Sequence, residues 1–253
     1  MKKALSISMI TLICCTSMLF GAEKMKTSCS DLPDHEALTA ALKKATGVGD
    51  PKANGGFAMN MWATLVGRDG TVCVVANTGA KWDDQWPGSR VISAQKANTA
   101  NAFSLTGLAI STANLFSLVQ PGGSLYGLQF SNPVDPSVAY AGSAANFGKV
   151  NDPMVGKRIG GINVFGGGLA LYNAEGQIVG AIGTSGDTAC ADHNIAWKVR
   201  KALNLDKVPA GVNKSKGGKG DDNIIYDIVD GKSKSGFGHP DCGLGEKAIS
   251  DSF

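Results

Sequence analysis

Charged residues are scarce in this chain, and positive and negative residues nearly balance. Only 18% of its 253 residues are Asp, Glu, Lys or Arg, whereas 43% are hydrophobic, and the formal net charge is +3. A chain of this length and composition can bury a sizeable core, which excludes a disordered protein. Because no stripe of Lys and Arg interleaves with aromatic residues, we expect no nucleic-acid partner.

Long apolar runs are missing beyond the N-terminus. Residues 1–22 begin with Lys2 and Lys3, continue as an apolar stretch and end in Gly-Ala, a pattern typical of a secretory signal peptide. Cys14 and Cys15 lie inside this segment and leave a lipoprotein anchor open as an alternative. No later stretch approaches the ~20 apolar residues of a membrane helix. We therefore predict a periplasmic or secreted protein with no membrane span after cleavage.

Cysteine is also infrequent, and four residues remain after the predicted cleavage: Cys29, Cys73, Cys190 and Cys242. An even number in an oxidising compartment favours disulfides over metal thiolates. Cys73 lies between valines in a predicted strand, and we expect it to be a buried core thiol. We predict a disulfide between Cys190 and Cys242, with Cys29 as an alternative partner of Cys242.

The remaining sequence alternates between helical and strand patterns. Apolar residues at helical spacing predict helices over 34–46 with Asp34 as the N-cap, over 89–120 after Pro87-Gly88, and over 188–203. Asp69-Gly70 and Glu175-Gly176 each separate two apolar runs, as in β-hairpins. These elements predict an α+β fold, with an antiparallel sheet of about five strands covered by helices.

Two further regions are rich in glycine. Residues 124–168 contain many Gly, Asn, Pro and Ser residues, and we predict an ordered, functional loop there because long structureless loops are uncommon in compact domains. Residues 206–253 form a basic, glycine-rich linker and a C-terminal tail packed on the domain. A short strand is expected within "NIIYDIVDG" of this tail.

Two motifs carry a resemblance to a known family. "VISAQKANTANAF" and the later "GGLALYNAEGQIVGAIGTSGDTACADHNIAW" resemble the GlcG/HbpS family of haem-binding proteins, which have a Ser-x-x-Lys-Ala-x-Thr-Ala helix and a Gly-Ala-Ile-Gly-x-Ser-Gly turn before a helix. The resemblance implies a profilin-like domain over 23–205, a homo-oligomer, and haem or a related tetrapyrrole as cofactor. The loop and tail resemble an extended, exported subgroup. The resemblance transfers no iron ligand.

The turn before the last of these helices is a candidate anion site. A strand that ends in a glycine turn and enters a helix directs free N–H groups and the positive end of the helix dipole toward one spot, which suits a haem propionate. Alternatively, Asp187 or Thr188 only caps the helix, and the glycines only allow the turn. The candidate binding residues are Gly183, Thr184, Ser185, Gly186 and Asp187.

The helix over 188–203 has two different faces. At 100° per residue, one side faces the sheet, and Cys190, His193 and Trp197 form a ridge on the opposite side, toward solvent or the tail. His193 and His239 are candidate iron ligands, with a surface role as the alternative for His193, and His35 is expected to be solvated. The mirrored "CADH" and "HPDC" also permit a Cys2His2 zinc site, although export favours the disulfide. The predicted sheet-facing residues are Thr188, Asp192, Ile195, Val199, Ala202 and Leu203.

Lys96 and Arg158 complete the candidate cofactor site, and either is a possible partner for Asp192. The leading hypothesis is an exported haem-binding protein that serves haem storage, sensing or trafficking. One alternative is an enzyme that acts on a small carboxylate or on haem through Lys96, Asp192, Arg158 and His193. Another is a structural domain whose long loop serves only oligomer contacts. The Ser-x-x-Lys spacing of Ser93 and Lys96 is a weak enzyme signal, because the companion motifs of acyl-serine enzymes are missing.

Overall fold

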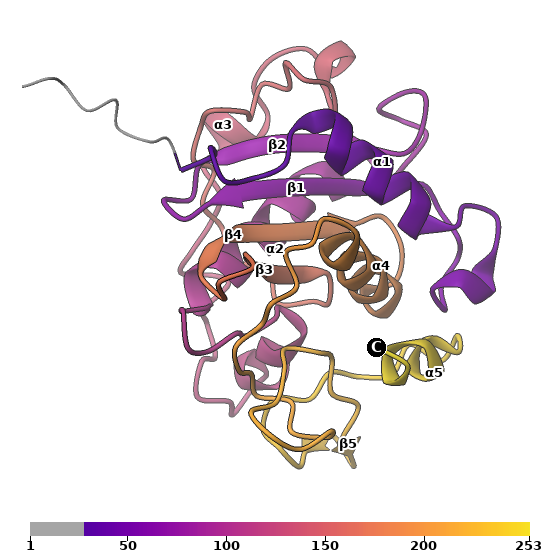
Figure 1. The fold of residues 1–253 in the computed structure, drawn as a ribbon, viewed down its shortest axis with the longest axis vertical. Helices are drawn as coiled ribbons and strands as arrows, with labels where there is room; N and C mark the ends of the chain where they lie inside the picture. The colour runs from indigo at the N-terminus through magenta and orange to yellow at the C-terminus, as the bar shows by residue number, and fades with distance from the viewer. Residues whose placement is uncertain (1–27) are drawn as a thin grey trace, which may run out of the picture.

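A computed structural model describes residues 28–253, so the predicted signal peptide, with Cys14 and Cys15, lies outside the described residues. Four strands form one antiparallel sheet in the order β2-β1-β4-β3 (Figure 1). Their bounds are β1 (Trp62–Gly67), β2 (Val72–Asn77), β3 (Gly168–Tyr172) and β4 (Ile178–Ser185). The helices are α1 (His35–Thr46), α2 (Ser89–Phe103), α3 (Pro136–Ala139), α4 (Ala189–Ala202) and α5 (Glu246–Asp251).

The α+β prediction is confirmed, but the main sheet has four strands rather than about five. Both predicted hairpins are present, and Gly70 has the positive φ of 81° that the first turn requires. In the tail, only β5 (Ile228–Val229) forms within the predicted short strand, and it pairs with β6 (Lys232–Ser233) in a separate ribbon. Asn223 and Ile224 join no strand, because the Ile224 amide donates to the Asn223 side chain.

Helices cover both faces of the sheet. Leu38 and Leu42 of α1 and Ile195 of α4 pack on one face, and small residues of α2 pack on the other. Gly183 of β4 lets α2 approach closely, because a Cβ there would lie 1.9 Å from the carbonyl oxygen of Ser93. Within residues 28–253, no helix is long and apolar enough to cross a membrane.

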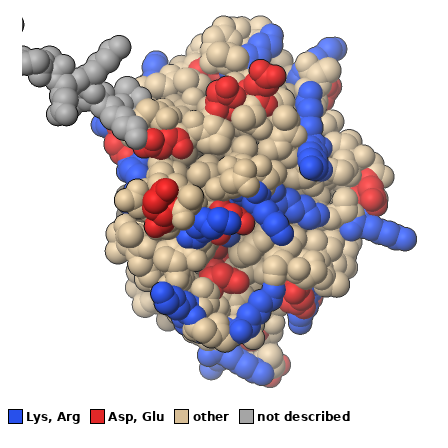
Figure 2. Space-filling model, viewed as in Figure 1, with Lys and Arg blue, Asp and Glu red and all other residues tan. Residues whose placement is uncertain are grey.

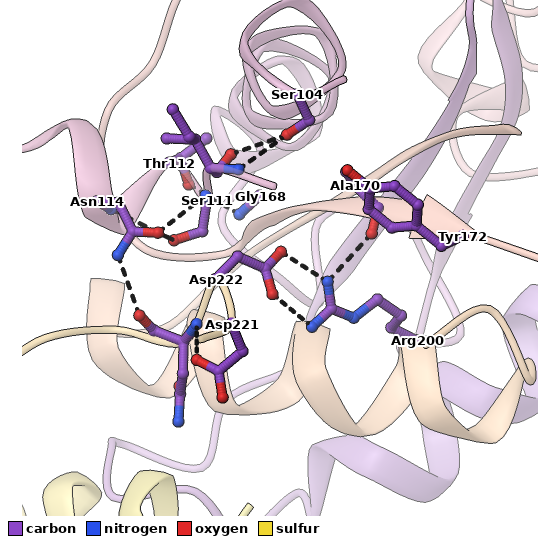
Figure 3. A network of polar contacts seen from close by, with 12 residues as sticks. Ser104, Ser111, Thr112, Asn114, Gly168, Ala170, Tyr172, Arg200, Asp221 and Asp222 are labelled. Atoms are coloured by element: carbon purple, nitrogen blue, oxygen red, sulfur yellow. Dashed lines mark hydrogen bonds and ion pairs between the residues drawn. The ribbon is translucent and has the colours of Figure 1, made fainter. Parts of the chain in front are cut away.

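Residues 105–120 correct the sequence prediction, because they do not continue the helix α2. They contain two single turns of 3-10 helix, η2 (Ala113–Leu115) and η3 (Ser117–Val119). Side chains satisfy the backbone here: the Ile110 amide donates to the Ser104 hydroxyl at 3.0 Å, and the Ser111 amide donates to Asn114 Oδ1 at 3.1 Å (Figure 3). Such local bonds compete with helix formation.

The long loop over 124–168 is built on a buried ion pair. Arg90 Nε donates to Asp152 Oδ2 at 2.8 Å, and a second guanidinium nitrogen donates to the carbonyl of Ala139 at 3.0 Å. Short turns within the loop include α3 and η4 (Ala144–Asn146). His35, which was expected to be solvated, is half-buried with Nε2 2.7 Å from the Gly148 carbonyl, because the loop folds over the start of α1.

Two disulfides fasten the ends of the described chain. Cys190 and Cys242 are joined as predicted. Cys29 pairs with Cys73, so the prediction of a buried core thiol at Cys73 is wrong. The reason is that β2 is an edge strand on which Cys73 is only half-buried, within reach of the N-terminal segment.

The tail lies along α4 and covers its outer ridge. Arg200 forms a buried bidentate ion pair with Asp222, at 2.7 and 2.8 Å (Figure 3). The Trp197 ring stacks on Phe253 at 5.5 Å.

On the face seen in Figure 2, basic and acidic side chains are interspersed on a largely uncharged surface. One predicted sheet-facing residue, Ala202, is exposed, because it lines a groove between α1 and α4.

Candidate functional site

Lys96 and Asp192 form a buried ion pair between α2 and α4. Lys96 Nζ lies 2.7 Å from Asp192 Oδ2 and donates to the carbonyl of Thr184 at 3.1 Å. The two side chains are only 2% and 3% exposed. Burial raises the pKa of Asp192 to about 6, although the nearby Lys96 opposes the shift. Of the two partners considered for Asp192, the structure selects Lys96.

The turn at Gly183–Asp187 is buried behind this pair. The Asp187 amide donates to Asp192 Oδ1 at 2.9 Å, and the Thr184 hydroxyl donates to the Asp192 carbonyl at 2.6 Å. The Asp187 carboxylate accepts from the amides of Phe57 and Met59. Thr188 is the N-cap of α4, as one of the two sequence interpretations proposed. The Asp187 amide is therefore already bonded within the protein.

His193 is fully buried under the tail, so a surface role for it is wrong. The tail covers the ridge on which the helical spacing places it. Its Nε2 lies 3.1 Å from Asn223 Oδ1, while the Asn223 amide group donates to the Ser250 carbonyl. The same Nε2 also accepts a hydrogen bond from the Ile224 amide, at 3.1 Å. Nδ1 has no hydrogen-bond partner among the described residues.

His239 has the same character. It is 2% exposed, and its Nδ1 lies 2.8 Å from the Pro240 carbonyl, which can only accept a hydrogen bond. Nε2 therefore carries the lone pair, and it also lacks a partner within residues 28–253. The ring contacts Phe116, with centroids 5.0 Å apart. Phe116 in turn lines a cavity of ≈ 500 Å³ between residues 116–123 and the β5–β6 ribbon.

Both imidazoles are neutral at pH 7. Burial, the charge of Arg200 and then that of His239 lower the pKa of His193 to about 3. Burial likewise lowers the pKa of His239 to about 4, and both rings also feel the charge of Lys96. His239 donates one N–H to a protein acceptor and keeps its other nitrogen free, which is the arrangement found in metal-binding histidines.

Arg158 lies away from Lys96, Asp192 and the two buried histidines. It forms an exposed ion pair with Asp69, at 2.5 Å, beside the β1–β2 turn. Trp62 of β1 pairs with Ser185, whereas Gly67 pairs with Gly180, so the two turns lie at opposite ends of the sheet. The four residues named for the enzyme hypothesis are therefore split between two places.

The disulfide bears on the alternative of a zinc site. Ligand atoms of Cys190, Cys242 and Glu246 lie within 4.8 Å of one another. With the sulfurs joined, neither is a thiolate, and the Glu246 carboxylate accepts from the amides of Cys242 and Leu244. A zinc site at these cysteines would require the reduced protein.

Residues 52–201 match the family described as "Haem degrading protein HbpS-like". The match covers more than half of the chain. The chain belongs to the HbpS-like family. The structure of Klebsiella pneumoniae protein ORFY is similar, with 26% identity, a TM-score of 0.44 and coverage of 68% of this chain and 90% of that one. A PduOC complex with haem shows 24% identity, a TM-score of 0.47 and coverage of 70% and 98%. No curated protein matches the chain.

The HbpS-like region contains only some of the residues that surround the two buried histidines. Lys96, Asp192 and His193 lie within the matched residues, whereas Asn223 and His239 belong to the tail beyond them. Sequence reasoning singled out His239 but missed Asn223 and the ion pair of Arg200 with Asp222. The only local signal was "GDDN" at the end of the linker, which does not indicate which side chains turn inward.

Proposed function

We propose that this protein binds haem on the tail side of the domain, with His239 and His193 as the candidate iron ligands. The observation that carries the proposal is the pair of buried neutral imidazoles, each with one nitrogen that lacks a partner among the described residues. Most buried polar atoms have a hydrogen-bond partner, and a bound ligand or ion is one explanation for an exception. Membership of a family described as haem-degrading supports this choice of cofactor.

His239 is the better placed of the two. Phe116 contacts its ring and lines the ≈ 500 Å³ cavity, which lies in the usual size range of cofactor pockets. Lys232 lies in the wall of the cavity as a cation for a propionate. Bound haem would supply a redox-active iron, for which an imidazole is a common axial ligand. Because His239 is almost fully buried, Phe116 has to move to admit the ligand.

The other predicted site residues have a supporting role in this proposal. Lys96, Asp192 and Gly183–Asp187 hold the start of α4 and thereby position His193. Direct contact between the turn and a propionate would first require the bond from the Asp187 amide to Asp192 to break. Arg158 lies at the other end of the sheet and takes no part.

A hemin titration tests the proposal. We expect a saturable shift of the Soret band with the wild-type protein, and loss or displacement of that band in His239→Gln. His193→Gln tests the second ligand. His35→Gln is the matched control and is expected to bind normally. No saturable shift in the wild-type protein would refute haem binding. Wild-type spectra in both His239→Gln and His193→Gln would refute the ligand assignment. A Soret band that decays after loading would indicate haem degradation.

Export and self-association belong to the same proposal. The two disulfides support an oxidising compartment, and the predicted signal peptide supports secretion or a periplasmic location.

The long loop carries three exposed aromatic side chains, which supports a homo-oligomer that covers them. They are Tyr126, Phe130 and Tyr140, at 60%, 78% and 69% exposed. Light scattering after gel filtration is expected to give more than the monomer mass, and Phe130→Ser is expected to lower it. A monomeric wild-type protein would refute self-association.

A further inference from the structure

A second cavity lies at the opposite edge of the sheet from the tail. It has a volume of ≈ 340 Å³ and lies between the loop after β2 and the segment that starts at η4. Two of its walls are aromatic: the rings of Trp82 and Phe147 are 6.4 Å apart and nearly perpendicular, at 82°. Lys81 and Lys149 line it as well, against one acidic side chain, that of Asp83.

Both walls are held from inside the protein. The Arg90 guanidinium lies 3.7 Å above the Phe147 ring, and Arg90 is itself fixed by Asp152. The loop that carries Trp82 is braced by the buried Gln85, which accepts from the Gly79 amide and donates to the Lys81 carbonyl. A cavity with rigid walls binds a ligand without the entropic cost of ordering loops.

We propose that this cavity binds a planar aromatic carboxylate of one or two rings. The perpendicular aromatic walls suit a flat ring, which stacks on one wall and meets the edge of the other. The two lysines leave an excess of one positive charge over Asp83, which favours an anionic substituent at the mouth. This ligand differs from haem in size and in place, so the inference does not rest on the proposed haem site.

Isothermal titration calorimetry with 2-naphthoate tests this site, with the neutral 2-naphthamide as the matched ligand. We expect saturable binding of one 2-naphthoate per chain and at least about tenfold weaker binding of the amide. Trp82→Ala is expected to weaken binding by about tenfold or more, because one aromatic wall is lost. Lys81→Ala with Lys149→Ala is expected to remove the preference for the acid.

Trp86→Ala is the control variant, because Trp86 is 46% exposed and does not line the cavity. It is expected to bind 2-naphthoate like the wild type. Circular dichroism confirms that each variant folds. No saturable binding in the millimolar range overturns the site, unchanged binding in folded Trp82→Ala overturns its location, and equal binding of acid and amide overturns the ligand class. The hemin titration is repeated on Trp82→Ala and is expected to match the wild type, so the two proposals can fail separately.

Discussion

Lys96 and Asp192 connect helices on opposite faces of the sheet, and neither has contact with water to screen its charge. Such a pair contributes little net stability, but removing one member leaves the other charge buried without compensation. We expect Lys96→Met to lower the free energy of unfolding by about 3–5 kcal/mol. Urea denaturation measures this change.

Two variants serve as controls for this prediction. Adding Asp192→Asn to Lys96→Met should recover part of the loss, because the side chain keeps an acceptor for the Asp187 amide but loses its charge. Lys207→Met removes an exposed ion pair with Asp206, and should cost less than about 1 kcal/mol. A Lys96→Met protein as stable as Lys207→Met would contradict the prediction.

The two buried histidines make the protein sensitive to acid. Their folded pKa values, about 3 and about 4, lie below the value near 6.5 of an unfolded chain. Below pH 6.5 the unfolded state therefore binds more protons, and the stability that the neutral rings contribute is lost as the pH falls toward 4. Each ring is expected to lower the free energy of unfolding at pH 5 by about 2 kcal/mol relative to neutral pH.

Asp192 acts in the opposite direction. Its raised pKa of about 6 means that the folded state binds the proton more readily, which offsets part of the loss between pH 7 and pH 5. Urea denaturation at both pH values measures the free energy of unfolding. From pH 7 to pH 5 this free energy should decrease less for a protein carrying His193→Gln and His239→Gln than for the wild type. The hypothesis fails if the double variant keeps the full decrease.

At the scale of elements, the contact between α2 and β4 depends on a residue without a side chain. A Cβ at position 183 would overlap the Ser93 carbonyl and push the helix off the strand. We expect Gly183→Ala to lower the melting temperature and to destabilise the protein by about 3 kcal/mol, the upper range for overpacking. Gly88→Ala is the control, since nothing lies within 4 Å of a Cβ there. Equal melting temperatures for the two variants would argue against this close packing.

At the scale of the whole molecule, the disulfides hold both ends of the described chain against the sheet and α4. Cys190 and Cys242 are 52 residues apart, and replacing both by serine is expected to cost about 4 kcal/mol in the chain-entropy model. We also expect His239 to become reactive toward diethyl pyrocarbonate, because the tail that buries it loses its covalent anchor. Mass spectrometry of the modified peptide measures this.

The second disulfide supplies the comparison. Serine at Cys29 and Cys73 should also lower stability, because 44 residues separate the two cysteines, but it should leave His239 protected. Equal modification of His239 in the two double variants would mean that the tail is held by its other contacts alone, above all the ion pair of Arg200 with Asp222.

Local patterns predicted much of the fold. Asp34 caps α1, Gly70 forms a hairpin turn, and Thr188 caps α4, because capping and positive φ depend on a residue and its nearest neighbours. The pairing of Cys190 with Cys242 followed from export and from the mirrored motifs. The pairing of Cys29 with Cys73 was missed, since it depends on which strand lies at the edge of the sheet.

The amino-acid sequence by itself determined the α+β class, the hairpins, the helix faces and the resemblance to a haem-binding family, because periodicity and short motifs act over a few residues. Only the tertiary structure decided that His193 is buried, that Lys96 rather than Arg158 neutralises Asp192, and that Asn223 turns toward His193. Burial and pairing depend on segments far apart in the chain meeting at one place, and no local pattern records which of them do.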